Sequence, residues 1–251
     1  MSWMPRNFLM LLCLFAGMGK ATDSISVDPN MRHTPTAPTV WQRLDSSLAD
    51  LGNLVIHERV ERYVGSGART HRRDSLDAVV EVVDGVEQYS GIWRGGRAIP
   101  EVAQLGGLWS FGELATLLRV TREALRKPVI EDGGDICFLV PASQRRWYIG
   151  VDGKTFWLDF EGHVTVSPLT GEISRIDWIS APAPAGSGVA RVTWSVLFHS
   201  VEVGGRNFTL PAEATYRVAR AGAGNRAEWN VTTFSDYARY GAEATISFAP
   251  E

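Results

Sequence analysis

Short apolar runs separated by glycine-containing turns fill the stretch from Trp147 to Ile179. Three pairs of a polar residue and a glycine divide it: Asp152-Gly153, Glu161-Gly162 and Thr170-Gly171. Such pairs allow the positive φ that a tight turn needs, and between β-rich runs they predict hairpins. We therefore expect a β-meander whose strands pair with their neighbours in sequence. The four runs are Trp147–Ile149, Thr155–Phe160, Val164–Val166 and Ile173–Ile179.

Alternation of apolar and polar positions predicts more strands on both sides of this stretch. In Ala190–Val203 and Asn207–Val218 one parity is apolar and the other polar, which is typical of a sheet with one covered and one wet face. After Arg226 the apolar parity runs through Trp229 and Val231 and then shifts, which predicts a bulge near Thr233. The other predicted strands are Leu54–Val64, Ser75–Val83, Val86–Trp93 and Ala242–Phe248.

Helical spacing of apolar residues predicts two helices, Trp41–Leu51 and Gly112–Arg126, the second after a glycine-rich loop. A sheet with one covered face needs elements to cover it. We therefore expect an α+β fold, in which a long, curved antiparallel sheet of about ten strands, an unclosed half-barrel, wraps over two helices. The alternative is a β-sandwich with peripheral helices.

The start of the chain has the features of a secretory signal peptide. Arg6 precedes the apolar run Phe8–Phe15, and the small-x-small site Gly19-Lys20-Ala21 follows. The run is too short to span a membrane as a helix. We expect a signal peptide over residues 1–21, a flexible leader over 22–38 and a single half-barrel domain over 39–251. The protein would then be exported, to the periplasm or the extracellular space, with no transmembrane segment in the mature chain.

The charge and cysteine content give no reason to expect nucleic-acid binding or an intrachain disulfide. The chain has 25 basic and 28 acidic residues, and cleavage would remove Arg6 and Lys20, leaving 23 minus 28, a net charge of −5. A mildly acidic chain gives no reason to expect binding to nucleic acid. Cys137 would be the single cysteine of the mature chain, so no intrachain disulfide is expected. Because Cys137 lies in an apolar run, we expect a buried, inert thiol.

No catalytic, cofactor or metal motif survives inspection. Gly153-Lys154-Thr155 lacks the first glycine of a phosphate-binding loop, and Tyr148 stands in its place. His57-Glu58 begins like a zinc-helix motif, but Glu61 stands where the second histidine should be. The five histidines lie far apart in sequence. We therefore expect no enzyme, cofactor or metal site.

The remaining charged residues of interest are expected to be structural. Glu58, Glu61 and Asp159 could form paired carboxylates, but we expect them to be solvated or ion-paired. The doublet Arg72-Arg73 is expected to be solvent-facing strand residues rather than an anion site.

Two sets of short stretches resemble two groups of known proteins. Phe156-Trp157-Leu158-Asp159, followed after a turn by Gly171–Ile176, is similar to part of the periplasmic lipoprotein carriers of the LolA and LolB type, whose fold is an unclosed barrel with helices as its lid. A second likeness, to an uncharacterised group of exported acidobacterial proteins, rests on Gly107–Gly112, the same Phe156–Asp159 piece, Phe208–Pro211 and the closing Tyr240-Gly241. The first resemblance implies a carrier, and the second implies no activity.

Aromatic residues are the one unusual feature of the composition, and most of them are expected in the core. Some could instead line a cavity for an acyl chain or another apolar ligand. We therefore expect a non-enzymatic binding or carrier protein for a lipid, an acylated protein or another apolar ligand. The alternative is an envelope protein with a filled core that serves structure or interaction. The candidate cavity-lining residues are Trp147, Phe156, Trp157, Trp178, Trp194, Leu117 and Leu118.

Overall fold

The computed structural model describes residues 53–66, 69–84, 86–99, 130–132, 135–140, 142–144, 148–151, 154–167, 172–222 and 226–239, together with residue 42. These residues belong to one compact unit, Thr34–Glu251. Nearly all of them are β-strand, and the 3-10 turn η2 (Ala142–Gln144) joins two of the strands.

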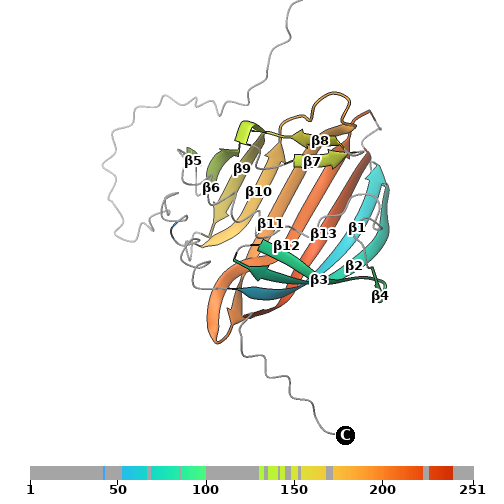
Figure 1. Cartoon of the computed structure of the whole chain (residues 1–251). Helices are drawn as coiled ribbons and strands as arrows, with labels where there is room; N and C mark the ends of the chain where they lie inside the picture. The colour runs from blue at the N-terminus through green and yellow to red at the C-terminus, as the bar shows by residue number, and fades with distance from the viewer. Residues whose placement is uncertain are drawn as a thin grey trace, which may run out of the picture. The chain divides into compact units, whose positions relative to one another are not determined.

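Eleven strands form one antiparallel sheet with the order β4-β3-β2-β1-β13-β12-β11-β10-β9-β6-β5. Figure 1 shows β1 to β3 at one end of this sheet and β5, β6 and β9 at the other. Because β4 and β5 are the two edges, the sheet is not closed into a barrel. Its strands are β1 (Leu54–Ser66), β2 (Arg69–Val83), β3 (Val86–Arg94), β4 (Arg97–Ala98), β5 (Ile130–Asp132), β6 (Asp135–Val140), β9 (Phe160–Val166), β10 (Ile173–Ser180), β11 (Val189–Val203), β12 (Arg206–Arg220) and β13 (Arg226–Arg239).

Alternate residues of each long strand are buried, which defines a buried face and an exposed face of the sheet. On β11, Val192, Trp194 and Val196 are at most 2% exposed, so the parity predicted for this strand is confirmed. Trp194 lies opposite Trp178 of β10, and this cross-strand pair lies in the main apolar core. Phe160 packs edge-on against Trp178, and Tyr216 packs edge-on against Trp194. Four neighbouring strands are therefore joined by aromatic contacts on the buried face.

A separate hairpin of two strands, β7 (Tyr148–Val151) and β8 (Lys154–Trp157), contributes to the same core. Val151 pairs with Lys154, so the predicted hairpin is confirmed, although Asp152 and Gly153 themselves lie outside the described residues. Ile149 is 6% exposed and belongs to the main core cluster, and Phe156 packs against that cluster.

The predicted α+β class is wrong. Among the residues that the structure describes, only the isolated residue Gln42 is helical, and the sheet wraps no pair of helices. Instead, the hairpin β7–β8 adds Ile149 to the core of the sheet. The alternative of a β-sandwich is also wrong, because eleven of the strands form one continuous sheet and the second sheet has two strands. The predicted helices Trp41–Leu51 and Gly112–Arg126 lie outside the described residues, apart from residue 42.

The predicted meander is correct at its two ends and wrong in its middle. Glu161-Gly162 is not a turn but lies inside β9, where Gly162 is opposite Trp178. A glycine at this position leaves room beside the large indole. The two strands are separated instead at Leu158-Asp159, between the end of β8 and the start of β9. There the Asp159 carboxylate accepts a hydrogen bond from the backbone N–H of Ala142 (2.6 Å). Asp159 thus fixes the start of η2, and β8 does not pair with β9.

Candidate functional site

A bulge where β13 meets β1 organises the polar residues on both faces of the sheet. His57 is opposite Ser235 and Val55 is opposite Ala238, so Asp236 and Tyr237 together face Ile56 alone. Asp236, the first of the two bulged residues, has a φ of 52°, which lies in the left-handed region of backbone conformation. Aspartate tolerates this conformation better than most residues. The bulge therefore lies three residues beyond the predicted position, Thr233. It leaves Ser235 and Asp236 beside His57 and returns Tyr237 to the buried face.

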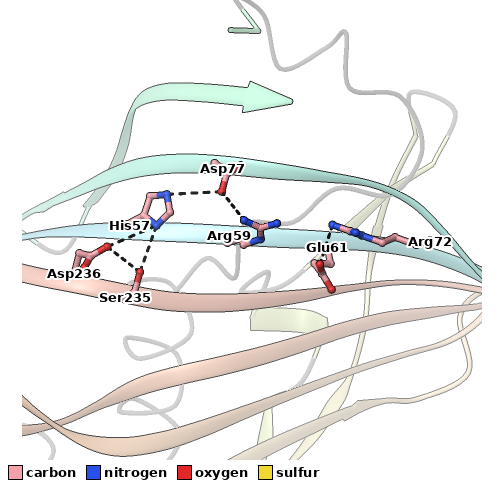
Figure 2. Close-up of polar contacts among 7 residues, drawn as sticks. All are labelled: His57, Arg59, Glu61, Arg72, Asp77, Ser235 and Asp236. Carbon is pink, nitrogen blue, oxygen red and sulfur yellow. Dashed lines mark hydrogen bonds and ion pairs between the residues drawn. The ribbon is translucent and has the colours of Figure 1, made fainter. Parts of the chain in front are cut away.

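On the exposed face, His57 links three strands (Figure 2). Its Nε2 lies 3.8 Å from Asp77 Oδ1 on β2, and its Nδ1 lies 3.3 Å from Ser235 Oγ and 3.9 Å from Asp236 Oδ2 on β13. Arg59 lies 3.9 Å from the same Asp77 carboxylate. Figure 2 shows these side chains in a row along the three strands.

This exposed set is not arranged to activate a serine nucleophile. The Ser235 hydroxyl donates to Asp236 Oδ2 at 3.1 Å, whereas serine catalysis transfers that proton to the imidazole. β1 is paired on both sides within the sheet, so its backbone N–H groups are used by the ladder and do not form an oxyanion hole. The set therefore joins β1, β2 and β13 as a network of hydrogen bonds and ion pairs.

A second set on the exposed face contains the thiol. Cys137 Sγ lies 3.2 Å from His163 Nδ1 across the β6–β9 pair, and His163 Nε2 lies 2.9 Å from Glu161 Oε1. A thiol, an imidazole and an orienting carboxylate have the order of a nucleophile, a base and its support. The prediction of a buried thiol is wrong, since Cys137 is partly exposed. Both strands are paired on each side, so this set also lacks free backbone donors for an oxyanion.

The buried face of β1 carries two charged residues between apolar ones. Leu54, Ile56 and Val60 are buried as the parity requires, but Glu58 and Arg62 share that parity and are 0% and 1% exposed. The two charged residues are four positions apart, about 14 Å along the strand.

Glu58 lies in an apolar environment. Its cross-strand neighbours are Phe234 on β13 and Ala78 on β2, and Ile92 on β3 follows in the same row. Neither carboxyl oxygen has a hydrogen-bond partner among the residues that the structure describes. The expectation that Glu58 is solvated or ion-paired is therefore wrong.

Burial determines the charge state of Glu58. Loss of hydration, reinforced by the negative charge of Glu87, raises the pKa of the Glu58 carboxyl from 4.5 to about 9. At neutral pH the group is consequently an uncharged carboxylic acid that can donate a hydrogen bond. Burial, and secondarily the Glu58 charge, also raises the pKa of Tyr237, whose hydroxyl donates to the carbonyl of Pro211 at 2.6 Å.

Arg62 is paired where Glu58 is not. Its guanidinium donates two hydrogen bonds to Asp74 on the neighbouring strand, and Arg94 Nε lies 3.6 Å from the same carboxylate. The hydrogen bond from Arg62, and then the charges of Arg62, Arg94 and Arg73, lower the pKa of Asp74 below its ordinary value. An open pocket of about 420 Å³ adjoins this pair, lined by Arg72, Arg73, Asp74, Ser75, Arg94 and Gly95.

The predicted cavity-lining residues have different surroundings. Trp178 and Trp194 are buried neighbours, and Phe156 is partly buried against the same core. Trp157 is partly exposed at the end of β8, opposite Tyr148. The structure does not describe Trp147, Leu117 and Leu118. Whether these residues line a cavity therefore stays a prediction.

The sequence analysis did not identify Glu58 and Arg62 as buried charged residues, although the apolar pattern of β1 indicates it. The parity Leu54, Ile56, Val60 and Val64 is apolar, so a charged residue at the same parity must be buried. The Cys137–His163 contact gives no such signal, because it depends on the register between two strands 26 residues apart.

Two further properties hold for the described part of the chain. No group of three histidine, cysteine, aspartate or glutamate side chains within it is placed to hold a metal ion. No helix within it has the length and apolar character needed to cross a membrane.

Comparisons with known proteins identify no family. No family model matches the sequence, and no curated protein matches it. Among solved structures, the chain is similar to the crystal structure of a DUF1329 family protein from Desulfovibrio piger, with 13% identity and a TM-score of 0.32. The match covers 84% of this chain and 93% of that one. A likeness at this level assigns no function, and it names neither the lipoprotein carriers nor an acidobacterial group, so both resemblances stay predictions.

Proposed function

We propose that this protein is a non-enzymatic binding or carrier protein that holds an apolar ligand, such as a lipid or the acyl chain of a protein, against the buried face of its sheet. The observation that carries the proposal is Glu58, a fully buried carboxyl group without a partner among the described residues. A buried polar group left unpaired destabilises a protein by about 1–3 kcal/mol. A core that served only to fold the chain would gain from an apolar side chain at this position.

A ligand gives this carboxyl a role. Sites for small apolar molecules are lined by apolar and aromatic side chains with a few polar groups that fix orientation. The neutral Glu58 carboxyl can donate a hydrogen bond to an ester, ketone or hydroxyl oxygen, and Phe234 and Ile92 in its row supply apolar contact. This role distinguishes the proposal from an interaction protein with a filled core. In such a protein Glu58 would lower stability and serve no ligand.

Export belongs to the same proposal. It is supported by Arg6, the apolar run Phe8–Phe15 and the site ending at Ala21, which together have the order of a signal peptide. A carrier of apolar molecules is useful where they must cross water, as between two membranes or outside the cell.

Titration with prodan, a neutral fluorescent naphthalene ketone, tests the proposal. We expect saturable binding to the wild-type protein, because the ketone oxygen can accept a hydrogen bond from the protonated Glu58 carboxyl while the ring system contacts apolar side chains. Glu58→Leu should weaken binding about tenfold, the loss of one buried hydrogen bond, and Glu58→Gln should retain most of it because the amide also donates. The readout is the blue-shifted prodan emission as a function of protein concentration.

The matched control is Glu213→Leu, which removes an exposed carboxyl from β12 and should leave binding unchanged. Absence of saturable binding to the wild type would favour the filled-core interaction protein. Equal affinity in wild type and Glu58→Leu would remove the observation on which the proposal rests.

A further inference from the structure

We propose that the arginine-lined pocket formed by the first half of β2 and the end of β3 binds a phosphate group. This site is separate from Glu58, and the inference does not depend on the proposed function. Arg72 and Arg73 are exposed strand residues, as expected, and both also line this pocket.

The charges around the pocket favour an anion. Three arginines, Arg72, Arg73 and Arg94, and one carboxylate, Asp74, line the pocket. Asp74 pairs with Arg62 and lies 3.6 Å from Arg94, and Glu61 pairs with Arg72 at 2.9 Å. The lining residues themselves therefore carry three positive charges and one negative charge, a net charge of +2. A phosphate monoester carries about −1.5 to −2 at neutral pH, so it would balance this excess.

Arg73 is the residue most available to a ligand. Arg62 is opposite Asp74 and Tyr63 is opposite Arg72, so Arg73 is the extra residue of a bulge and has no counterpart on β1. Bulges redirect side chains and are frequent beside functional sites. Arg73 makes no ion pair shorter than 4 Å with any residue of the described ranges. A guanidinium can bind two phosphate oxygens at once.

Two other lining residues suit a phosphate. The Ser75 hydroxyl can donate a hydrogen bond to an anion. Gly95 has a φ of 55°, and a side chain built on it would meet no atom within 4 Å, so this wall of the pocket is open.

The pocket also adjoins the apolar part of the buried face. Arg94 is opposite Leu76, and Leu76 is opposite Val60, two residues that are fully buried. A phosphate in the pocket could therefore come from free phosphate or from the headgroup of a lipid whose chains extend along this face. Both sources present the same chemistry to Arg73.

Calorimetric titration of the full chain with inorganic phosphate, and separately with a short-chain phosphatidic acid below its micelle concentration, distinguishes the two sources. Short-chain phosphatidylcholine, whose phosphate is masked by choline, is the reference ligand. We expect binding that Arg73→Gln weakens about tenfold, because one charged pair of hydrogen bonds is lost. Arg191→Gln, which removes an exposed arginine from β11 outside the pocket, should leave the affinity unchanged.

Binding of both ligands, weakened by Arg73→Gln, supports a site for phosphate as such. Binding of phosphatidic acid alone, weakened in the same way, supports a headgroup site. Absence of binding to either, or equal affinity in wild type and Arg73→Gln, would overturn the inference. Inorganic phosphate has no apolar part and prodan has no charge, so failure of one test leaves the other standing.

Discussion

Replacing Glu58 by leucine is expected to raise the free energy of unfolding by roughly 3 kcal/mol at pH 7. The pKa of the carboxyl is raised from 4.5 to about 9 in the folded protein. Between these values the unfolded chain releases the proton and the folded chain keeps it, and each pH unit lowers stability by about 1.4 kcal/mol. The wild type should therefore be most stable below the unfolded pKa, lose stability as pH rises toward about 9, and then level off. The leucine variant lacks this loss.

Urea denaturation at several pH values between about 5 and 9 measures the effect. Glu58→Gln should flatten the pH dependence as leucine does but gain less stability, because the amide is still polar and buried. Glu213→Leu, on the exposed face, is the control and should keep the wild-type pH dependence. A wild type whose stability does not fall between neutral pH and pH 9 would show that Glu58 is hydrated or paired.

Changing Asp74 to asparagine is expected to destabilise the protein by about 3 kcal/mol. The Arg62 side chain is 2% exposed and donates two hydrogen bonds to the Asp74 carboxylate. Without that carboxylate, the buried guanidinium loses the two hydrogen bonds and the negative charge that Asp74 supplies, which is more harmful than removing both partners. The double variant Arg62→Met/Asp74→Leu should recover most of the loss.

Chemical denaturation of the single and double variants gives the comparison. The exposed pair Arg175–Asp177, joined by hydrogen bonds of 2.5 and 2.8 Å, is the matched control, and Asp177→Asn should lower stability by less than about 1 kcal/mol. Because the pKa of Asp74 is lowered, its stabilising effect is present above the ordinary value of 3.8 and is lost as pH falls through the folded pKa. Equal stability losses for Asp74→Asn and Asp177→Asn would mean that Arg62 is hydrated.

The late strands could be predicted from the sequence because their alternation is regular. Trp194 and Val196 lie on the buried face of β11, as the parity indicates. On β13 the same reasoning chose the wrong parity: Asn230 and Thr232 are buried, whereas Trp229 stacks on Tyr63 of the exposed face at 5.5 Å. The apolar pattern alone cannot show that a polar residue is buried beside a polar cross-strand neighbour. Asn230 is opposite Arg62, and this polar neighbour becomes visible once the strand order is known.

The sequence also could not predict which element covers the sheet or where the polar sites lie. Both depend on contacts between strands that are distant in sequence. Amphipathic spacing indicated two helices, but it does not show which element packs against a sheet, and Ile149 of the hairpin β7–β8 belongs to the core. The pocket combines residues from two strands at a bulge, so its existence depends on the register between Arg62 and Asp74. Glu58, in contrast, could have been found from the parity of β1 alone.

Native mass spectrometry of the protein purified without detergent from the cells that produce it tests the central claim most directly. A binding protein whose buried face holds an apolar ligand should give a population with the mass of the polypeptide plus a non-covalent molecule of lipid size. That molecule should be released on denaturation, and its occupancy should fall in Glu58→Leu relative to Glu213→Leu. A wild-type spectrum that is compactly folded and shows the polypeptide mass alone would contradict the claim and favour a filled-core interaction protein.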